Sequence, residues 1–134
     1  MRINKNGFTM LELLAVIIIL GILITLAYMG VSRYLNQARS TTYEDFEKNI
    51  TSGVTNYLID HTGSIPNEGE SLVVDVEKLV CEGYIEDLQD PRESSKTCNL
   101  DSYAIVKRNN DTSSNMDIEY SACLKCSGYE SPAC

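Results

Sequence analysis

The sequence lacks the residue patterns that carry enzymatic chemistry. It has no nucleophile arrangement, no glycine-rich phosphate loop and no calcium loop of the form D-x-[DN]-x-[DN]-G. Its one histidine, His61, lies near the end of an expected helix, where a solvated or capping role is more common than catalysis. We therefore expect no enzymatic activity, no cofactor and no catalytic residue.

Basic residues are scarce as well, with 11 Lys and Arg against 19 Asp and Glu and a formal net charge of −8. No run of Lys and Arg rises above this acidic background, so we expect no dedicated nucleic-acid surface. The acidic surplus favours a solvated exterior. Four acidic residues could hold calcium, although a charged hairpin edge facing water explains them equally well; they are Asp101, Asp111, Asp117 and Glu119.

The chain does contain one long apolar run, from Phe8 to about Val31, with a single carboxylate, Glu12, near its start. As a helix, this run of about 24 residues would be roughly 36 Å long, enough to cross a bilayer. A charge at the centre of a membrane helix costs about 2.5–3.5 kcal/mol on insertion scales. Such residues usually have a partner and a function, so the partner of Glu12 is the main question that this sequence raises.

The N-terminus is not an ordinary signal peptide. Its basic leader, Met1 to Gly7, is short enough, but a secretory apolar region has about 7–15 residues and ends at a small-residue cleavage site. No such site follows this run, and the natural break lies before it, between Gly7 and Phe8. Cleavage there would leave the apolar helix on the mature protein and would lower the formal net charge from −8 to −10 by removing Arg2 and Lys5.

This N-terminus resembles that of the type IV prepilins. The features that carry the resemblance are a basic leader ending in Gly7, the segment Phe8-Thr9-Met10-Leu11-Glu12 and the aliphatic run that follows. The family includes the subunits of type IV pili, the pseudopilins of type II secretion and the competence pseudopilins. Many type IV pilins carry a helix-bending proline in this run. Here the first proline is Pro66, so local unwinding would have to use Gly21 or Gly30.

The resemblance implies a defined maturation and assembly. A membrane-embedded prepilin peptidase would cut between Gly7 and Phe8 and methylate the new Phe8 amine, and a glycine before the bond leaves its backbone accessible. Glu12 would pair with the Phe8 amine of a neighbouring copy, while related pilins and an inner-membrane assembly platform would be further partners. Two alternatives remain: Glu12 reaches the membrane interface of a plain anchor, or it pairs with the Phe8 amine of its own chain.

The resemblance also implies a single-pass inner-membrane protein with its headgroup outside the cytoplasm, bound to lipid before assembly and located in an envelope or surface filament afterwards. Charge counting does not set this orientation. Two basic residues, Arg2 and Lys5, precede the apolar run, and two, Arg33 and Arg39, follow it. The orientation rests on the resemblance and on the cysteines, which favour an oxidising compartment.

A second stripe of apolar residues continues the helix beyond the membrane run. The stripe recurs at spacings of three and four residues, which predicts an amphipathic helix; its members are Tyr43, Phe46, Ile50, Val54, Tyr57 and Leu58. With Gly63 as the stop signal, one helix could extend from Phe8 to about His61. The alternative is two helices separated near residues 30–32.

The remaining residues predict a small headgroup. Residues 64–70 are typical of a loop, and residues 75–82 predict a short helix with Val76, Leu79 and Val80 inward. Residues 103–108 and 116–122 predict a β-hairpin. The expected fold class is α+β, pilin-like, in four parts: leader 1–7, transmembrane and assembly helix 8–31, amphipathic continuation 32–62, and cysteine-containing headgroup 63–134.

Five cysteines lie in this headgroup, which predicts disulfides: Cys81, Cys98, Cys123, Cys126 and Cys134. Because five is an odd number, one thiol stays free, one pairs between chains, or the set is only partly oxidised. Fifteen pairings are possible, and we expect Cys81–Cys98 plus one bridge that fixes the tail. A zinc site on the C-x-x-C motif at 123–126 is an alternative, but a single such pair is weak evidence. Asn49 and Asn110 each begin a sequence that matches the glycosylation pattern.

Two functions from different classes fit these observations. The first is a structural subunit of a type IV pilus-like filament, assembled through its N-terminal helix. The second is a monomeric membrane-anchored domain that binds a ligand or protein through its headgroup. The first requires cleavage at Gly7 and depends on Glu12, whereas the second requires neither.

Overall fold

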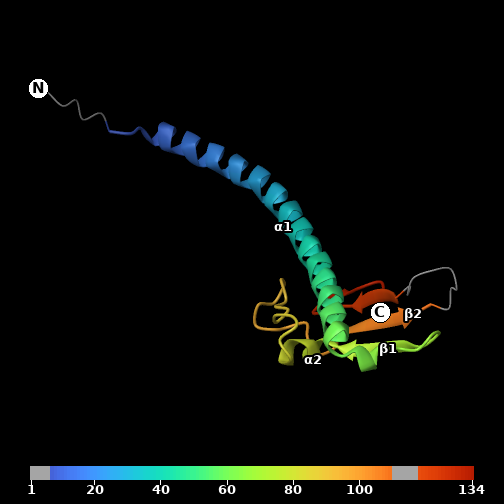
Figure 1. Cartoon of the computed structure of the whole chain (residues 1–134). Helices are drawn as coiled ribbons and strands as arrows, with labels where there is room; N and C mark the ends of the chain where they lie inside the picture. Colours follow the sequence, from blue (N-terminus) through green and yellow to red (C-terminus); the bar gives the residue numbers. More distant parts are fainter. Residues whose placement is uncertain (1–6, 110–117) are drawn as a thin grey trace, which may run out of the picture. The chain divides into compact units, whose positions relative to one another are not determined.

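The computed structural model describes residues 7–109 and 118–134, which divide into two compact units, one up to Ala38 and one from Arg39 onward. Helix α1, Met10–Asp60, contributes residues to both units, and the strands belong to the second (Figure 1). A long N-terminal helix with a small antiparallel sheet confirms the predicted α+β, pilin-like fold.

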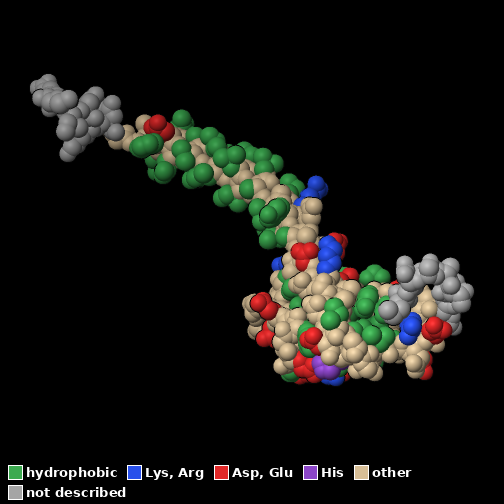
Figure 2. All heavy atoms as spheres, in the orientation of Figure 1, with side chains coloured by type: hydrophobic (Ala, Val, Ile, Leu, Met, Phe, Trp, Pro, Cys, Tyr) green, Lys and Arg blue, Asp and Glu red, His purple; other side chains and the backbone are tan. Residues whose placement is uncertain are grey.

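The first unit consists of the apolar part of α1. All of its described side chains up to Ala38 are exposed, including the large apolar ones. Figure 2 shows this part of the helix as a nearly continuous apolar surface. A helix satisfies its own backbone hydrogen bonds, which is what a chain surrounded by lipid requires. By length and hydropathy, α1 could cross a membrane.

The second unit begins with the remainder of α1, and here the predicted apolar stripe is confirmed. Five of its six members are buried and Phe46 is partly buried; the buried ones are Tyr43, Ile50, Val54, Tyr57 and Leu58. The helix ends at Asp60, and Gly63 lies in the following 3₁₀ turn, η1, Thr62–Ser64. Gly63 is therefore not the C-terminal cap of the long helix, but the predicted end was wrong by only one residue.

A three-stranded antiparallel sheet packs in this unit, in the order β1-β2-β3. Strand β2 spans Tyr103–Arg108 and strand β3 spans Ile118–Cys123, so the predicted hairpin is confirmed for the described residues. The predicted start of its second strand, at 116 and 117, lies outside them, as does the connecting segment. Strand β1, Ser71–Asp75, was not predicted. It has only five residues and leads directly into a helix, so its alternation is too short to recognise.

Helix α2, Val76–Cys81, confirms the predicted short helix. Val76 and Leu79 are buried in it. Gly83 closes the helix with a positive φ of 81°. The N–H of Gly83 bonds to the carbonyl of Val80 and the N–H of Tyr84 to that of Leu79, the pattern of a Schellman cap. Glycine adopts this left-handed conformation without strain.

The core of the second unit joins α1 to α2 and the sheet. Its fully buried members include Ile50 and Val54 from α1, Leu79 from α2 and Val106 from β2. Gly53 lies in the same buried face of α1, and a Cβ there would collide with the side chain of Ile85. The small residue thus allows the segment after α2 to lie close against the helix.

Two disulfides fasten the C-terminal part, where strands β4, Lys125–Cys126, and β5, Tyr129–Glu130, form a small two-stranded sheet. The bridges are Cys98–Cys126 and Cys123–Cys134, and Cys81 is a free, exposed thiol. The expected Cys81–Cys98 bridge is therefore wrong, because Cys98 pairs across the fold with the tail. The expected bridge that fixes the tail is confirmed.

Candidate processing and assembly site

The segment that precedes α1 is open to its surroundings. Gly7, Phe8 and Thr9 have no regular secondary structure, and Phe8 is 79% exposed. Among the described residues, apart from Gly7 itself and its chain neighbours, no heavy atom lies within 4 Å of the position that a Cβ of Gly7 would occupy. The bond between Gly7 and Phe8 therefore lies outside regular secondary structure, in a segment whose described residues are exposed and accessible to another molecule.

Thr9 starts the helix. Its side-chain oxygen accepts a hydrogen bond of 3.2 Å from the backbone N–H of Glu12, and its carbonyl accepts bonds from the N–H groups of Glu12 and Leu13. This is the Thr half of a capping box, and it explains why the helix begins at Met10 instead of Phe8. We did not predict this role, although the spacing T-x-x-E, residues 9–12, is the sequence signal for it.

Glu12 occupies the first turn of α1, where the helix dipole favours a negative charge. The residue is exposed, and none of the described residues forms an ion pair or hydrogen bond with its carboxylate. Phe8 and Glu12 are four residues apart, about one turn of helix. The structure places Gly7, Phe8 and Glu12 close together in one short segment and leaves them accessible to another molecule. The leader residues 1–6 lie outside the described part of the chain.

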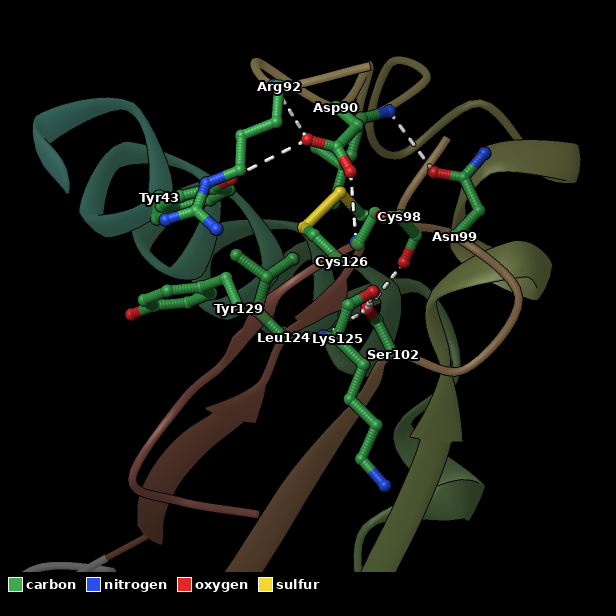
Figure 3. The surroundings of a disulfide bond; sticks show 12 residues. Tyr43, Asp90, Arg92, Cys98, Asn99, Ser102, Leu124, Lys125, Cys126 and Tyr129 are labelled. Atoms are coloured by element: carbon green, nitrogen blue, oxygen red, sulfur yellow. Dashed lines mark hydrogen bonds between the residues drawn. A yellow bond between two sulfur atoms is a disulfide. The ribbon is translucent and has the colours of Figure 1, made fainter. Parts of the chain in front are cut away.

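A group of hydrogen-bonded polar residues surrounds the Cys98–Cys126 bridge in the second unit (Figure 3). Asp90 is only 2% exposed and accepts hydrogen bonds from the backbone N–H of Arg92 at 2.8 Å and of Ser127 at 2.9 Å. Desolvation by itself would raise the pKa of Asp90, but these backbone donors outweigh it and lower the pKa. Asp90 is therefore held as a carboxylate that connects the loop after α2 to the tail.

Two tyrosines pack beside this carboxylate. The hydroxyl of Tyr43 lies 3.5 Å from Asp90, and its ring stacks on that of Tyr129 with centroids 4.1 Å apart. Tyr129 donates a hydrogen bond of 2.9 Å to Glu47. Desolvation and this bond raise the pKa of Tyr129 to about 12. We call Tyr43, Asp90, Tyr129 and the Cys98–Cys126 bridge the tail clasp, because together they attach the tail to α1 and to the preceding loop.

Sequence reasoning missed the tail clasp. We assigned no role to the region around Asp90 from the sequence, yet this region contains a buried charge. The Asp90-Pro91 dipeptide was an available signal, since Asp before Pro favours a turn in which the side chain bonds the backbone two residues on. The bond from the Arg92 N–H to Asp90 has this form. Nothing local indicated that Ser127 would supply the second donor.

Two buried serines secure the tail further. Ser102 accepts a bond of 2.9 Å from the N–H of Lys125 and donates to the carbonyl of Cys98. Ser131 accepts from the N–H of Leu124 at 2.9 Å and donates to the carbonyl of Ala122 at 3.0 Å. These hydroxyls pair with backbone groups in and beside the tail, so the tail is held by specific hydrogen bonds as well as by disulfides.

The remaining candidate residues do not converge on a site. Cys123 and Cys126 of the C-x-x-C motif each pair with a cysteine outside it, which leaves no thiolate there for zinc. Among the described residues, no three His, Cys, Asp or Glu side chains lie close enough to hold a metal ion. Asp101 and Glu119 are exposed, while Asp111, Asp117 and the glycosylation match at Asn110 lie outside those residues. Asn49 is exposed on α1.

His61 has a local structural role. Its ring stacks on Tyr57 with centroids 4.4 Å apart, and its Nδ1 lies 3.0 Å from the carbonyl of Tyr57. Because a carbonyl can only accept, Nδ1 donates in this bond. The ring thus adds a second hydrogen bond to a carbonyl near the end of α1 that already accepts one from the His61 N–H, and the residue itself is exposed.

Comparison with known proteins identifies relatives of this chain. Residues 2–28 match the model of the prokaryotic N-terminal methylation motif. The ComG operon protein 3 homolog of Bacillus licheniformis is 29% identical over 82 residues, which cover 61% of this chain and 76% of the relative. The competence protein ComGC of Bacillus subtilis is 26% identical with the same coverage. No solved structure matches the chain.

Proposed function

We propose that this chain is a structural subunit of a pilus-like filament. Its N-terminus matches the methylation motif of prepilins, and its relatives are ComGC competence proteins, which are type IV pilin-like. The observation that carries the proposal is the combination at residues 7–12 of an open Gly7–Phe8 bond and an exposed Glu12 without a described partner. Among the filament types, the names of the relatives favour a competence pseudopilus over a surface pilus or a secretion pseudopilus.

Maturation would proceed as the motif implies. A prepilin peptidase would remove residues 1–7 and methylate the Phe8 amine, leaving 8–31 as the transmembrane and assembly helix, 32–62 as its amphipathic continuation and 63–134 as the headgroup. The exposed Gly7–Phe8 segment supports this step, because a peptidase must bind the backbone in an extended form. The two disulfides support a headgroup outside the cytoplasm, where such bonds persist.

Assembly would bury the apolar helix among its copies. Its large side chains are exposed along the whole first unit, and an apolar surface of this extent needs a lipid or protein partner. In a filament interior, the Glu12 carboxylate would be dry and would need a cation. The Phe8 amine of a neighbouring copy supplies one, with an ordinary pKa of about 7.7–8.0 for a free α-amine. This pairing would favour one axial register between neighbours.

The test compares Glu12→Ala with the matched control Glu68→Ala, which removes an exposed loop carboxylate in the second unit. We expect both variants to be inserted and cleaved normally. Only Glu12→Ala should lose incorporation into filaments sheared from cells, because it alone lacks the counter-charge for the neighbouring amine. Normal incorporation of Glu12→Ala, or an equal loss in Glu68→Ala, would refute the assembly role of Glu12.

The alternative function, a monomeric membrane-anchored binding domain, makes the opposite prediction about processing. Intact-mass measurement of the native protein decides between the two. Loss of residues 1–7 with one methyl group added supports the filament subunit. A chain that still begins at Met1 supports the anchor.

A further inference from the structure

The apolar part of α1 has a length that matches a bilayer. Between Glu12 and Arg33 the helix has no charged residue, a span of 20 residues. At 1.5 Å per residue this span is about 30 Å long, the thickness of the hydrocarbon core of a typical bilayer. Every side chain in the span is exposed. Figure 2 shows the same feature, an apolar surface with charged side chains at its two ends.

At the C-terminal end of this span lie three side chains that are suited to a membrane surface: Tyr28, Arg33 and Tyr34. Both tyrosines are strongly exposed, at 75% and 72%. Tyrosine favours the membrane–water interface because its ring is apolar and its hydroxyl is polar. Arginine extends its guanidinium to the phosphate level while its stem stays in the apolar region.

These three residues surround the helix instead of marking one face. With about 100° of rotation per residue, Arg33 lies roughly 140° and Tyr34 roughly 240° around the axis from Tyr28. A protein partner that contacts one side of the helix would select side chains on that side. A lipid interface encloses the helix, so an even distribution around the axis fits lipid.

We infer that Tyr28, Arg33 and Tyr34 form an interfacial girdle that sets the depth of the helix in the phospholipid bilayer before assembly. The girdle lies at the headgroups of one leaflet. The 30 Å span then places Glu12 at the headgroups of the opposite leaflet, where water and lipid headgroups hydrate its carboxylate. The inference rests on the proposed membrane-bound subunit and adds the depth of its helix in the bilayer before assembly.

This depth in the bilayer determines when Glu12 needs a partner. In the bilayer the carboxylate is hydrated and needs no protein partner, so the free subunit is stable as a monomer. Its charge becomes unfavourable only when the helix leaves the membrane and Glu12 enters the dry surroundings of other helices. The neighbouring Phe8 amine is therefore required at the moment of assembly and not for insertion.

The chain has no tryptophan, which makes single tryptophans clean depth probes. The full chain is reconstituted in phosphatidylcholine vesicles with one tryptophan at Leu14, Leu23 or Val31, and fluorescence is quenched with lipids brominated at different acyl depths. We expect Leu23→Trp to be quenched best by the deepest bromines and the other two by the shallowest. Deepest quenching at Leu14 or Val31 would overturn the inference.

A second measurement tests the girdle itself. In the Val31→Trp chain, replacement of Tyr28, Arg33 and Tyr34 by leucine should let the helix slide and move the probe about 5 Å deeper, one helical turn. The matched control Met29→Leu with Leu35→Met changes two apolar residues in the same turns and should leave the probe in place. An unmoved probe in the girdle variant would show that these residues do not set the depth.

These outcomes are independent of the filament test. Vesicles contain no filament, so a failed depth prediction leaves the proposed subunit role intact. Conversely, normal filament incorporation of Glu12→Ala would refute the pairing and leave the measured depth valid.

Discussion

The two units of this chain differ in the solvent exposure of their apolar side chains. In the first unit, up to Ala38, leucines and isoleucines are exposed along the whole helix. In the second, Ile50, Val54 and Leu58 on the same helix are buried, and the first two are fully inaccessible. A single helix therefore has two kinds of surroundings: the side chains of its first part are exposed, and the stripe of its second part packs with α2 and the sheet.

The source of stability differs between the two units. The second unit carries its own core, two disulfides and the tail clasp, so it should fold from its own residues. In the first unit, the described residues 7–38 include no buried side chain, and an apolar surface of this kind is favourable only beside lipid or other apolar side chains. Substitutions should therefore act on folding in one unit and on insertion or assembly in the other.

The largest expected effect comes from separating the units. A fragment of residues 39–134 should be soluble without detergent and should unfold in one cooperative transition, because its core is internal. The full chain should need detergent or lipid. Solubility, gel filtration and thermal unfolding followed by circular dichroism test this. A fragment that lacks a cooperative transition would contradict the independence of the second unit.

Two isoleucines of α1, one in each unit, allow a direct test of this difference in exposure. Ile50→Ala leaves a cavity in the core and should lower the free energy of unfolding of the headgroup by about 2–5 kcal/mol. Ile18→Ala removes the same atoms from a side chain that is 55% exposed and should leave that free energy unchanged within about 0.5 kcal/mol. Both are measured by denaturant titration of the full chain in detergent micelles. Equal effects would contradict the assignment of the two environments.

The disulfides allow a comparison within the second unit. Loss of Cys98–Cys126, through Cys98→Ala with Cys126→Ala, should cost about 2–4 kcal/mol, because this bridge closes a loop with a sequence separation of 28. Cys81→Ala removes an exposed free thiol and should change stability by less than about 0.5 kcal/mol. Peptide mapping without reducing agent checks the pairing directly. A Cys81–Cys98 fragment in that map would overturn it.

The smallest expected effect concerns pH. The pKa of Tyr129 in the folded chain is about 12, above its ordinary value of 10.0, so folding favours the protonated phenol. The resulting stabilisation is complete below about pH 10 and is lost as the pH rises towards 12. Tyr129→Phe should lower stability by about 1 kcal/mol at neutral pH through loss of the bond to Glu47.

The same variant should flatten the alkaline part of the stability curve between pH 10 and 12. Urea titrations at several pH values measure both effects. Tyr103→Phe, which alters a tyrosine in β2 outside the tail clasp, is the control. If the two variants lose stability with the same alkaline dependence, Tyr129 is not the responsible group.

Local patterns predicted much of the fold. The stripe from Tyr43 to Leu58 repeats with the period of a helix, and apolar and polar residues alternate in strands β2 and β3. Each of these elements could therefore be predicted from the pattern of its own residues. The N-terminal motif was equally local, since Gly7, Phe8 and Glu12 lie within six residues. Strand β1 was missed because five residues that end in a helix give too short an alternation, and it becomes a strand by pairing with β2.

The tail clasp could not be read in this way. The Tyr43–Asp90 contact joins residues 47 positions apart, and the bond from Ser127 to Asp90 joins residues 37 apart. The burial of Asp90 depends on both and on the bridge beside it. The disulfide pairing has the same origin, because spacing along the chain does not say which cysteines meet.

Neighbouring residues along the chain were enough to predict the long helix, with its membrane-length apolar part and its amphipathic continuation, and the N-terminal motif at residues 7–12. Three features depend on tertiary contacts: the third strand, the pairing of Cys98 with the tail and the burial of a charged Asp90. Those features arise when segments distant in sequence come together and exclude water, so no local pattern contains them.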